Sequence, residues 1–136
     1  MSEKEIQQKY LELQILNTHI NQLTNQLNIL EQQILSLRVL DESMKDIKDV
    51  KIGSDILVPL GEGIFINGKL EDNRKVLLNV GNGIVVEKGL DEAKEMVLKQ
   101  IQEIKLLVYQ FDSELNNAVL RSQELQKELI KHSEEH

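Results

Sequence analysis

Cysteine and tryptophan are absent from this 136-residue sequence, and aromatic residues make up only 3% of it. Without cysteine the chain can form no disulfide, no thiolate nucleophile and no cysteine-ligated metal site. A thick globular core is also disfavoured, because compact cores draw heavily on aromatic side chains. The apolar residues are mainly leucine, isoleucine and valine, which suits the narrow seam of a coiled coil.

An excess of positive charge is also absent, since the formal net charge is −7 at pH 7. Nucleic-acid binding through phosphate contacts is therefore disfavoured, because it needs a basic stripe or patch. The sequence shows no stretch with the pattern of a signal peptide or a transmembrane span. We therefore expect a soluble, cytoplasmic protein that binds neither nucleic acid nor membrane.

Proline and glycine occur only in the middle of the sequence. The single proline is Pro59, and all seven glycines lie between Gly53 and Gly89. The flanks lack both helix breakers, which permits two long uninterrupted helices. The sequence thus divides into an N-terminal helix over 1–50, a middle zone over 51–89 and a C-terminal helix over 90–136.

A seven-residue apolar repeat runs through both flanks and predicts a coiled coil. In the first flank its a and d positions hold Ile6, Leu13, Leu16, Ile20, Leu23, Leu27, Leu30, Ile34, Leu37 and Met44. In the second flank they hold Leu90, Val97, Ile101, Ile104, Val108, Phe111, Leu115, Ala118, Ser122, Leu125 and Leu129. Two helices of roughly 45 residues, each about 70 Å long, are expected to pack antiparallel. Asp41 breaks the repeat, and we expect the first helix to leave its partner there.

The middle zone predicts two β-hairpins with glycine-rich turns. Its segment Leu60–Ile66 is echoed by Val80–Val86 at a constant offset of 20 residues. Four short strands are too few to be stable alone and leave open edges, so we expect other subunits to complete them. The strand residues expected to carry this oligomerisation are Val58, Leu60, Ile64, Ile66, Leu78, Val80, Ile84 and Val86.

The glycine-rich segments carry a family resemblance. Leu57–Gly63 and Val80–Lys88 are similar to the paired V-P-x-G-x-G and V-G-x-G-x-x-V-E-K segments of α-class prefoldin subunits. The layout agrees along the whole chain, because α-class subunits have two hairpins between their helices and β-class subunits have one. The resemblance implies a mainly α fold, in which a long antiparallel coiled-coil hairpin carries a small four-stranded β body. That body would join a multi-subunit β-barrel.

The same resemblance implies a function. Two α-class and four β-class subunits would form a hexamer that acts as an ATP-independent holdase chaperone without a cofactor. It would bind unfolded proteins at the distal tips of its coiled coils and deliver them to a group II chaperonin. The candidate client-binding residues at the tips, over about 1–15 and 122–136, are Ile6, Tyr10, Leu11, Leu13, Leu125, Leu129 and Ile130.

These tip residues fall into two groups. Ile6, Leu13, Leu125 and Leu129 occupy heptad positions, so packing in the seam is favoured over client contact for each of them. Tyr10, Leu11 and Ile130 lie off the heptad and are the better candidates, although scattered apolar residues are common on protein surfaces.

No catalytic or metal-binding pattern is found, and we expect no enzyme activity. The two G-x-G turns lack the third glycine of a dinucleotide site, since Ile66 and Val86 stand there. His19, His132 and His136 show no ligand spacing, so no metal site is expected.

Two other functions remain open alternatives. The first is a prefoldin-like filament or scaffold subunit, whose helices would look the same. The second is a transcription factor of the coiled-coil-finger type, which needs an acidic loop between its helices. The predicted β body lies between the two helices instead of such a loop, which disfavours the transcription-factor alternative.

Overall fold

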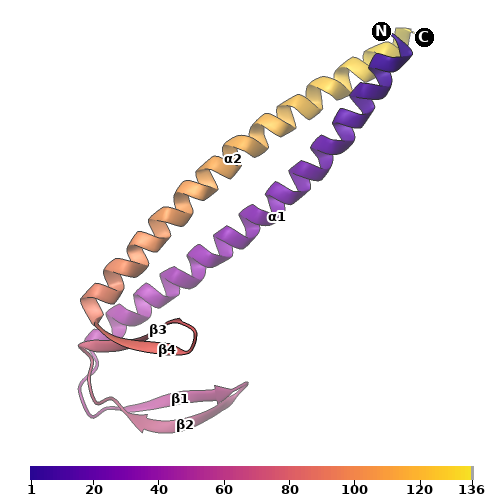
Figure 1. The fold of residues 1–136 in the computed structure, drawn as a ribbon. Helices are drawn as coiled ribbons and strands as arrows, with labels where there is room; N and C mark the ends of the chain where they lie inside the picture. The colour runs from indigo at the N-terminus through magenta and orange to yellow at the C-terminus, as the bar shows by residue number, and fades with distance from the viewer. Residues whose placement is uncertain (136) are drawn as a thin grey trace. The chain divides into compact units, whose positions relative to one another are not determined.

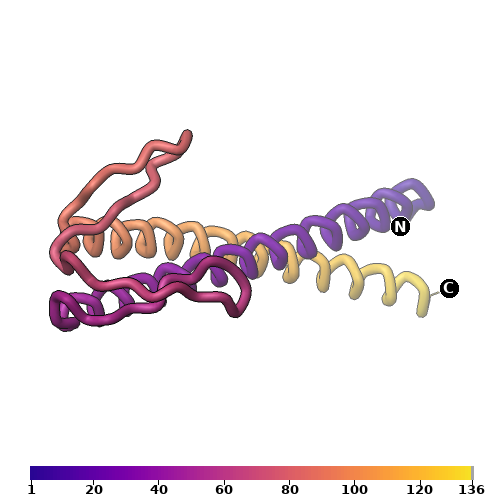
Figure 2. Tube along the Cα trace, turned by 90° about the horizontal axis from the view of Figure 1, so that it is seen from below, coloured from indigo at the N-terminus to yellow at the C-terminus, as the bar shows by residue number. Residues whose placement is uncertain are grey.

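The computed structural model describes residues 1–135, which fold in the order α1, β1, β2, β3, β4, α2 (Figure 1). The elements span Glu3–Lys48 (α1), Asp55–Gly61 (β1), Ile64–Lys69 (β2), Lys75–Gly81 (β3), Ile84–Gly89 (β4) and Leu90–Glu135 (α2). The two helices pack side by side and antiparallel (Figures 1 and 2). The predicted fold class of two long helices with two hairpins between them is therefore confirmed.

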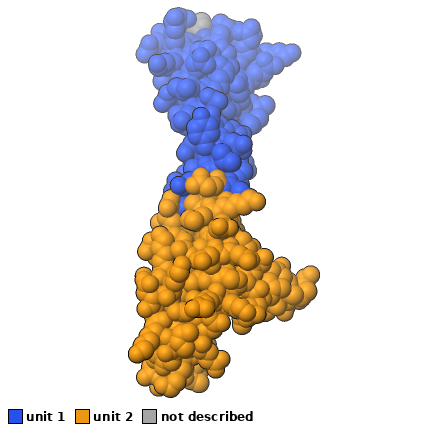
Figure 3. Space-filling model, turned by 90° about the vertical axis from the view of Figure 1, so that its left-hand side faces the viewer, with its two compact units in different colours: residues 1–34, 103–136 blue, residues 35–102 orange. Residues whose placement is uncertain are grey.

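The chain divides into two compact units, shown in Figure 3. Unit 1 comprises residues 1–34 and 103–136, which are the N-terminal part of α1 and the C-terminal part of α2. Unit 2 comprises residues 35–102 and contains the remaining helical turns and all four strands. Each helix runs without a break through both units, as expected for flanks that lack proline and glycine.

The seam of unit 1 consists of predicted a and d residues. The buried ones are Leu23, Leu27, Leu30, Ile104, Ala118, Ser122, Leu125 and Leu129. Leu125 is 0% exposed and is the most completely enclosed large side chain among the described residues. The heptad thus predicted which residues are buried, because a repeat of 3.5 residues keeps one stripe of each helix facing its partner.

In unit 2 the seam continues to the last turn of α1. Asp41 is only 8% exposed, Met44 is buried, and the Lys48 ammonium lies 3.2 Å from the Asp91 carboxylate of α2. The expectation that α1 leaves its partner at Asp41 was therefore wrong. Lys45 explains why the carboxylate is tolerated, since its ammonium lies 3.3 Å from one Asp41 oxygen. The other oxygen has no hydrogen-bond partner in the described residues.

The two hairpins have the same antiparallel register. β1 pairs with β2 and β3 pairs with β4, while residues 1–135 show no strand pairing between the hairpins. The register shifts by one residue between Pro59 and Gly61, and again between Asn79 and Gly81, so the 20-residue echo is structural. Figure 2 shows the hairpins as separate arms.

The segment between the hairpins is fastened to the end of α1. The Asn73 side-chain amide donates to the carbonyl oxygens of Lys48 and Val50, at 3.0 Å each. The last carbonyls of a helix have no partner within the helix, so this amide satisfies one that would otherwise need water. Leu70, just before Asn73, is buried. The segment between β2 and β3 is therefore attached to the end of α1.

Candidate binding surfaces

The hairpins present apolar side chains to solvent. Of the predicted oligomerisation residues, Leu78 and Val86 are half-buried, while six are exposed: Val58, Leu60, Ile64, Ile66, Val80 and Ile84. Their neighbours Leu57, Phe65, Leu77 and Val85 are exposed as well, and Leu77 reaches 72%.

This exposure occurs on both faces of each hairpin. In the first hairpin, Val58 faces Ile66 across the strands on one side, and Pro59 faces Phe65 on the other. A two-stranded hairpin is at best marginally stable in water, and dense apolar exposure marks an interaction surface. The hairpins therefore form an exposed apolar surface, and the role of these strand residues in oligomerisation stays a prediction.

The heptad residues of the predicted client site lie between the helices of unit 1. Leu125 and Leu129 are buried there, and Ile6 and Leu13 are half-buried. They pack the seam, and Leu13 also lines one of the grooves described below. Within the predicted range 122–136, His136 lies outside the described residues.

The predicted residues off the heptad are exposed. Tyr10 and Leu11 are each 57% exposed on α1, and Ile130 is exposed on α2. Ile15 is also exposed, at 61%, and was not among the predicted client contacts, although its heptad c position, two residues after Leu13, points it away from the seam. Three large apolar side chains thus stand on one short stretch of α1.

These three residues line two open grooves along α1, which we call the α1 outer face. The first has a volume of about 470 Å³ and is lined by Gln7, Tyr10, Leu11, Leu13, Gln14 and Asn17. The second has a volume of about 460 Å³ and is lined by Gln14, Ile15, Thr18, His19 and Gln22. They share Gln14, and neither is lined by an Asp, Glu, Lys or Arg side chain. The α1 outer face can therefore accept apolar groups without desolvating a carboxylate, ammonium or guanidinium group.

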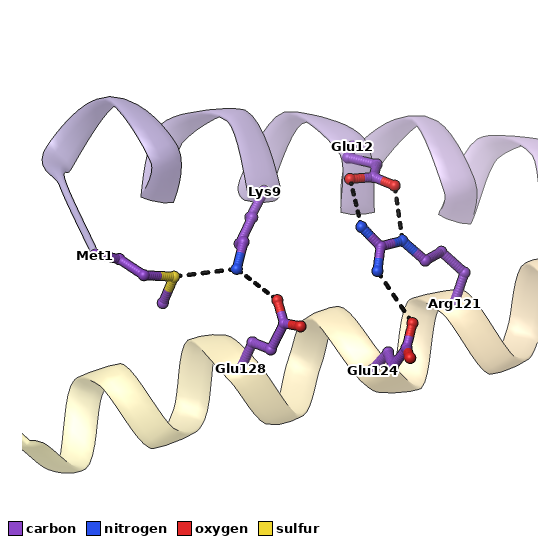
Figure 4. Close-up of polar contacts among 6 residues, drawn as sticks. All are labelled: Met1, Lys9, Glu12, Arg121, Glu124 and Glu128. Carbon is purple, nitrogen blue, oxygen red and sulfur yellow. Dashed lines mark hydrogen bonds and ion pairs between the residues drawn. The ribbon is translucent and has the colours of Figure 1, made fainter.

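A cluster of ion pairs joins the helices beside this face (Figure 4). The Arg121 guanidinium of α2 donates to both carboxylate oxygens of Glu12 of α1, at 2.9 and 3.2 Å, and to Glu124 at 3.0 Å. The Lys9 ammonium donates to the Glu128 carboxylate. Two-point arginine–carboxylate contacts have a well-defined geometry. These contacts, which we call the tip clasp, include two links across the seam, Arg121–Glu12 and Lys9–Glu128.

Three residues of the tip clasp have pKa values that differ from their ordinary values. The hydrogen bond from Arg121 lowers the pKa of Glu12, and the hydrogen bond from Lys9 lowers the pKa of Glu128. The bonds from Arg121 to Glu12 and Glu124 raise the pKa of Arg121. Glu12, Glu128 and Arg121 are therefore charged at neutral pH.

The clasp should make the stability of unit 1 depend on pH in a predictable direction. The folded-state pKa values of Glu12 and Glu128 lie below the ordinary value of 4.5, so their stabilisation is fully present above pH 4.5. It is lost as the pH falls through the folded-state pKa values. The double variant Glu12→Gln/Glu128→Gln should melt below the unmodified chain at pH 7, and the difference should shrink as the pH falls below 4.5.

Thermal melting followed by circular dichroism measures this difference. The matched control is Glu31→Gln/Glu103→Gln, which removes two exposed unit 1 carboxylates that form no ion pair within residues 1–135. A gap between the Glu12/Glu128 variant and the unmodified chain that stays constant as the pH falls below 4.5 would show that ionic contacts do not cause it.

The contacts of the tip clasp were not predicted from the sequence. Glu12 and Arg121 each stand one residue before a heptad a position. His19 and Glu114 occupy equivalent positions, and their side chains lie 3.0 Å apart. Such positions flank the seam and meet across it. Matching these positions in antiparallel order along the two flanks would have predicted the Glu12–Arg121 and His19–Glu114 contacts.

Two further classes of site are unsupported. No helix within residues 1–135 combines the length and the apolar content needed to cross a membrane. The same residues contain no cluster of acidic or histidine side chains that could hold a metal ion.

Comparison with known proteins places the chain in a family. The family model described as "Prefoldin subunit" matches residues 16–135. The prefoldin subunit alpha of Archaeoglobus fulgidus is 31% identical over 128 residues, which cover 94% of this chain and 93% of the relative. The prefoldin subunit alpha of Thermofilum pendens is 33% identical over 87 residues, which cover 64% of this chain and 67% of the relative.

The fold agrees with these relatives. A chain in the cryo-EM structure of filamentous PFD from Methanocaldococcus jannaschii matches with a TM-score of 0.77 at 22% identity, covering 88% of this chain and 98% of that one. Because the family model and the Archaeoglobus relative each align along most of its length, the chain belongs to the prefoldin family of non-enzymatic chaperones, as an alpha-class subunit.

Proposed function

We propose that this chain is the alpha subunit of a cytoplasmic holdase, which holds unfolded proteins without ATP and passes them to a group II chaperonin. Its partners are beta-class subunits, in a hexamer of two alpha and four beta subunits. The family membership supports the chaperone role. The observation that carries the assembly is the dense apolar exposure of the hairpins, which a stable soluble monomer would not retain.

The client-binding surface in this proposal is the α1 outer face. The heptad residues Ile6, Leu13, Leu125 and Leu129 contribute by packing the seam, and the tip clasp keeps that seam closed. Tyr10, Leu11 and Ile15 are then the apolar groups that a client reaches on α1. Ile130 offers a further exposed side chain on α2.

The chemistry of this face suits weak and general capture. Glutamine, asparagine and threonine surround the apolar groups, and no charged residue occurs between Glu12 and Glu31. Such a surface has no fixed charge pattern for a client to match. Each contact is weak, but several arms that hold one client together increase the overall affinity by avidity.

Suppression of aggregation tests this function. The purified chain is mixed with a beta-class prefoldin, and light scattering from a denatured client diluted into ATP-free buffer is followed. A trimmed form lacking residues 1–12 and 126–136 serves as the comparison. We expect full-length assemblies to suppress scattering and trimmed assemblies to fail, because trimming removes Tyr10, Leu11 and the end of the seam.

The size of the assembly is the control for this experiment. If both forms make hexamers and both fail to suppress aggregation, the ends of these helices are not the working surface. If the chain forms particles of unlimited length in place of hexamers, a filament or scaffold role explains the hairpins better.

A further inference from the structure

Two charged residues, Lys9 and Asp41, stand on the seam side of α1. Counting back seven residues from Leu16 places Lys9 at a d position, and counting on seven from Ile34 places Asp41 at an a position. Both are withdrawn from solvent, since Lys9 is half-buried and Asp41 is buried. Core positions of a coiled coil normally hold apolar residues, so both charges need a physical reason.

Stability does not supply that reason for Asp41. The Lys45 ammonium, one turn later on the same helix, lies 3.3 Å from one Asp41 oxygen, and the other oxygen has no hydrogen-bond partner within residues 1–135. Replacing a buried ion pair by apolar residues of similar volume is often neutral or stabilising. A polar residue at a core position can instead fix which helices pair and in which register.

The rest of the α1 seam is well suited to pairing with a second copy of α1. Its other a positions alternate isoleucine and leucine from Ile6 to Ile34. Its d positions from Leu16 to Leu37 are all leucine, and this combination favours parallel two-stranded coiled coils. The e and g positions, which usually set partner choice, would meet without repulsion in such a dimer, as Glu12–Asn17, His19–Thr24, Gln26–Glu31 and Gln33–Arg38.

Lys9 and Asp41 oppose this self-pairing. In a parallel pair each a or d residue packs against the same residue of the other copy, so Lys9 would meet Lys9 and Asp41 would meet Asp41. Lys45 would still cover only one oxygen of each Asp41, and the two unpartnered oxygens would share one layer of the seam. Like charges that are withdrawn from water repel strongly.

The pairing of α1 with α2 avoids both clashes. In unit 1, the Lys9 ammonium donates to the Glu128 carboxylate of α2 (Figure 4). In unit 2, α2 brings no second carboxylate into the seam beside Asp41, because its a and d positions there are Leu90, Lys94, Val97 and Ile101. Each charge is therefore accommodated with α2 as the partner and repelled with a second α1.

We propose that Lys9 and Asp41 together select the partner of α1. They exclude parallel pairing with α1 of a second copy of the chain, and so leave α2 as the helix that α1 can pack against. This selection is obtained at the expense of stability at Asp41, and it does not depend on the holdase proposal.

A cysteine reporter tests the selection, because the chain has no cysteine of its own. Ile20→Cys places one thiol at an a position, where two copies form a disulfide readily when their α1 helices lie parallel and in register. The full chain is equilibrated in a glutathione redox buffer, and covalent dimers are measured on non-reducing gels. Adding Lys9→Leu/Asp41→Leu should raise the ratio of covalent dimer to monomer at least about tenfold, and each single substitution should raise it less.

The matched control is Lys4→Leu/Asp46→Leu in the same Ile20→Cys background. It removes one lysine and one aspartate from exposed f positions of α1, outside the seam, and should leave the dimer ratio unchanged. Thermal melting of the chain without the reporter gives a second readout. Asp41→Leu should melt at a higher temperature than the unmodified chain, because it removes a buried oxygen that has no partner in the described residues.

Two results would overturn the proposal. One is a Lys9→Leu/Asp41→Leu variant that forms no more covalent dimer than the Lys4→Leu/Asp46→Leu control. The other is an Asp41→Leu variant that melts below the unmodified chain, which would show that Asp41 is retained for stability. Assemblies of the unmodified chain with a beta-class subunit can suppress client aggregation in either case, so the holdase proposal is judged separately.

Discussion

Replacing Tyr10, Leu11 and Ile15 together by alanine is expected to weaken client capture by the assembled complex by about tenfold, or about 1.4 kcal/mol. Each of these side chains is more than half exposed in the free chain and would lose apolar surface to water when a client binds. Burying such area contributes roughly 25 cal/mol per Å², so three partly covered side chains readily account for this effect. Alanine preserves the helix, which isolates the contacts from folding.

The measurement is the anisotropy of a fluorescent, chemically unfolded client titrated with the assembled complex without ATP. The matched control is Leu98→Ala/Leu106→Ala/Tyr109→Ala, which removes one tyrosine and two aliphatic side chains that are exposed on α2. We expect the control to bind as the unmodified complex does. Equal losses in the two variants would mean that any exposed apolar group serves and that the α1 outer face has no special role.

Truncating Leu125 to alanine is expected to destabilise the coiled coil by about 2 to 5 kcal/mol. Leu125 is 0% exposed in unit 1, so its loss leaves a cavity in the seam. The control is Ile130→Ala, a comparable truncation five residues along at an exposed position, which should change stability by no more than about 0.5 kcal/mol. Urea unfolding followed by circular dichroism compares the two.

The Leu125→Ala variant also separates two views of client binding. If clients bind the α1 outer face, the weakened seam of Leu125→Ala should leave the affinity for client unchanged at temperatures where the helices stay folded. A clear gain in affinity would mean that a loosened seam exposes additional client contacts. That outcome would move the site from the outer face to the seam.

The sequence predicted the helices and their seam closely, because the heptad repeat is a local pattern with a single geometric solution. Leu23, Leu27 and Leu125 were placed in the seam by counting alone, and each is buried. The two hairpins were predicted for a similar reason. Their glycines include Gly63 (φ 70°) and Gly83 (φ 73°), which adopt the positive φ that tight hairpin turns require.

The errors concern side-chain contacts and exposures that the heptad pattern alone does not encode. Asp41 was expected to end the seam, because a carboxylate at an a position is costly to bury, yet Lys45 one turn later makes it tolerable. The Asn73 contacts with the end of α1 depend on a loop conformation that no short pattern encodes. Ile15 lies within the predicted tip range of about 1–15 but was not among the predicted client contacts, although its exposure follows from its heptad position.

The central claim is that clients bind the α1 outer face while the seam stays closed, and reversible cross-linking of the seam tests it most directly. The chain contains no cysteine, so Lys9→Cys/Glu128→Cys introduces a unique pair where the two native side chains meet. A short cleavable bis-maleimide bridges the pair before assembly with the beta-class subunit, and the same variant capped with a mono-maleimide is the control. We expect the bridged complex to bind unfolded client with the same affinity before and after the linker is cleaved. Client binding that appears only after cleavage would contradict it and would show that the helices must separate to hold a client.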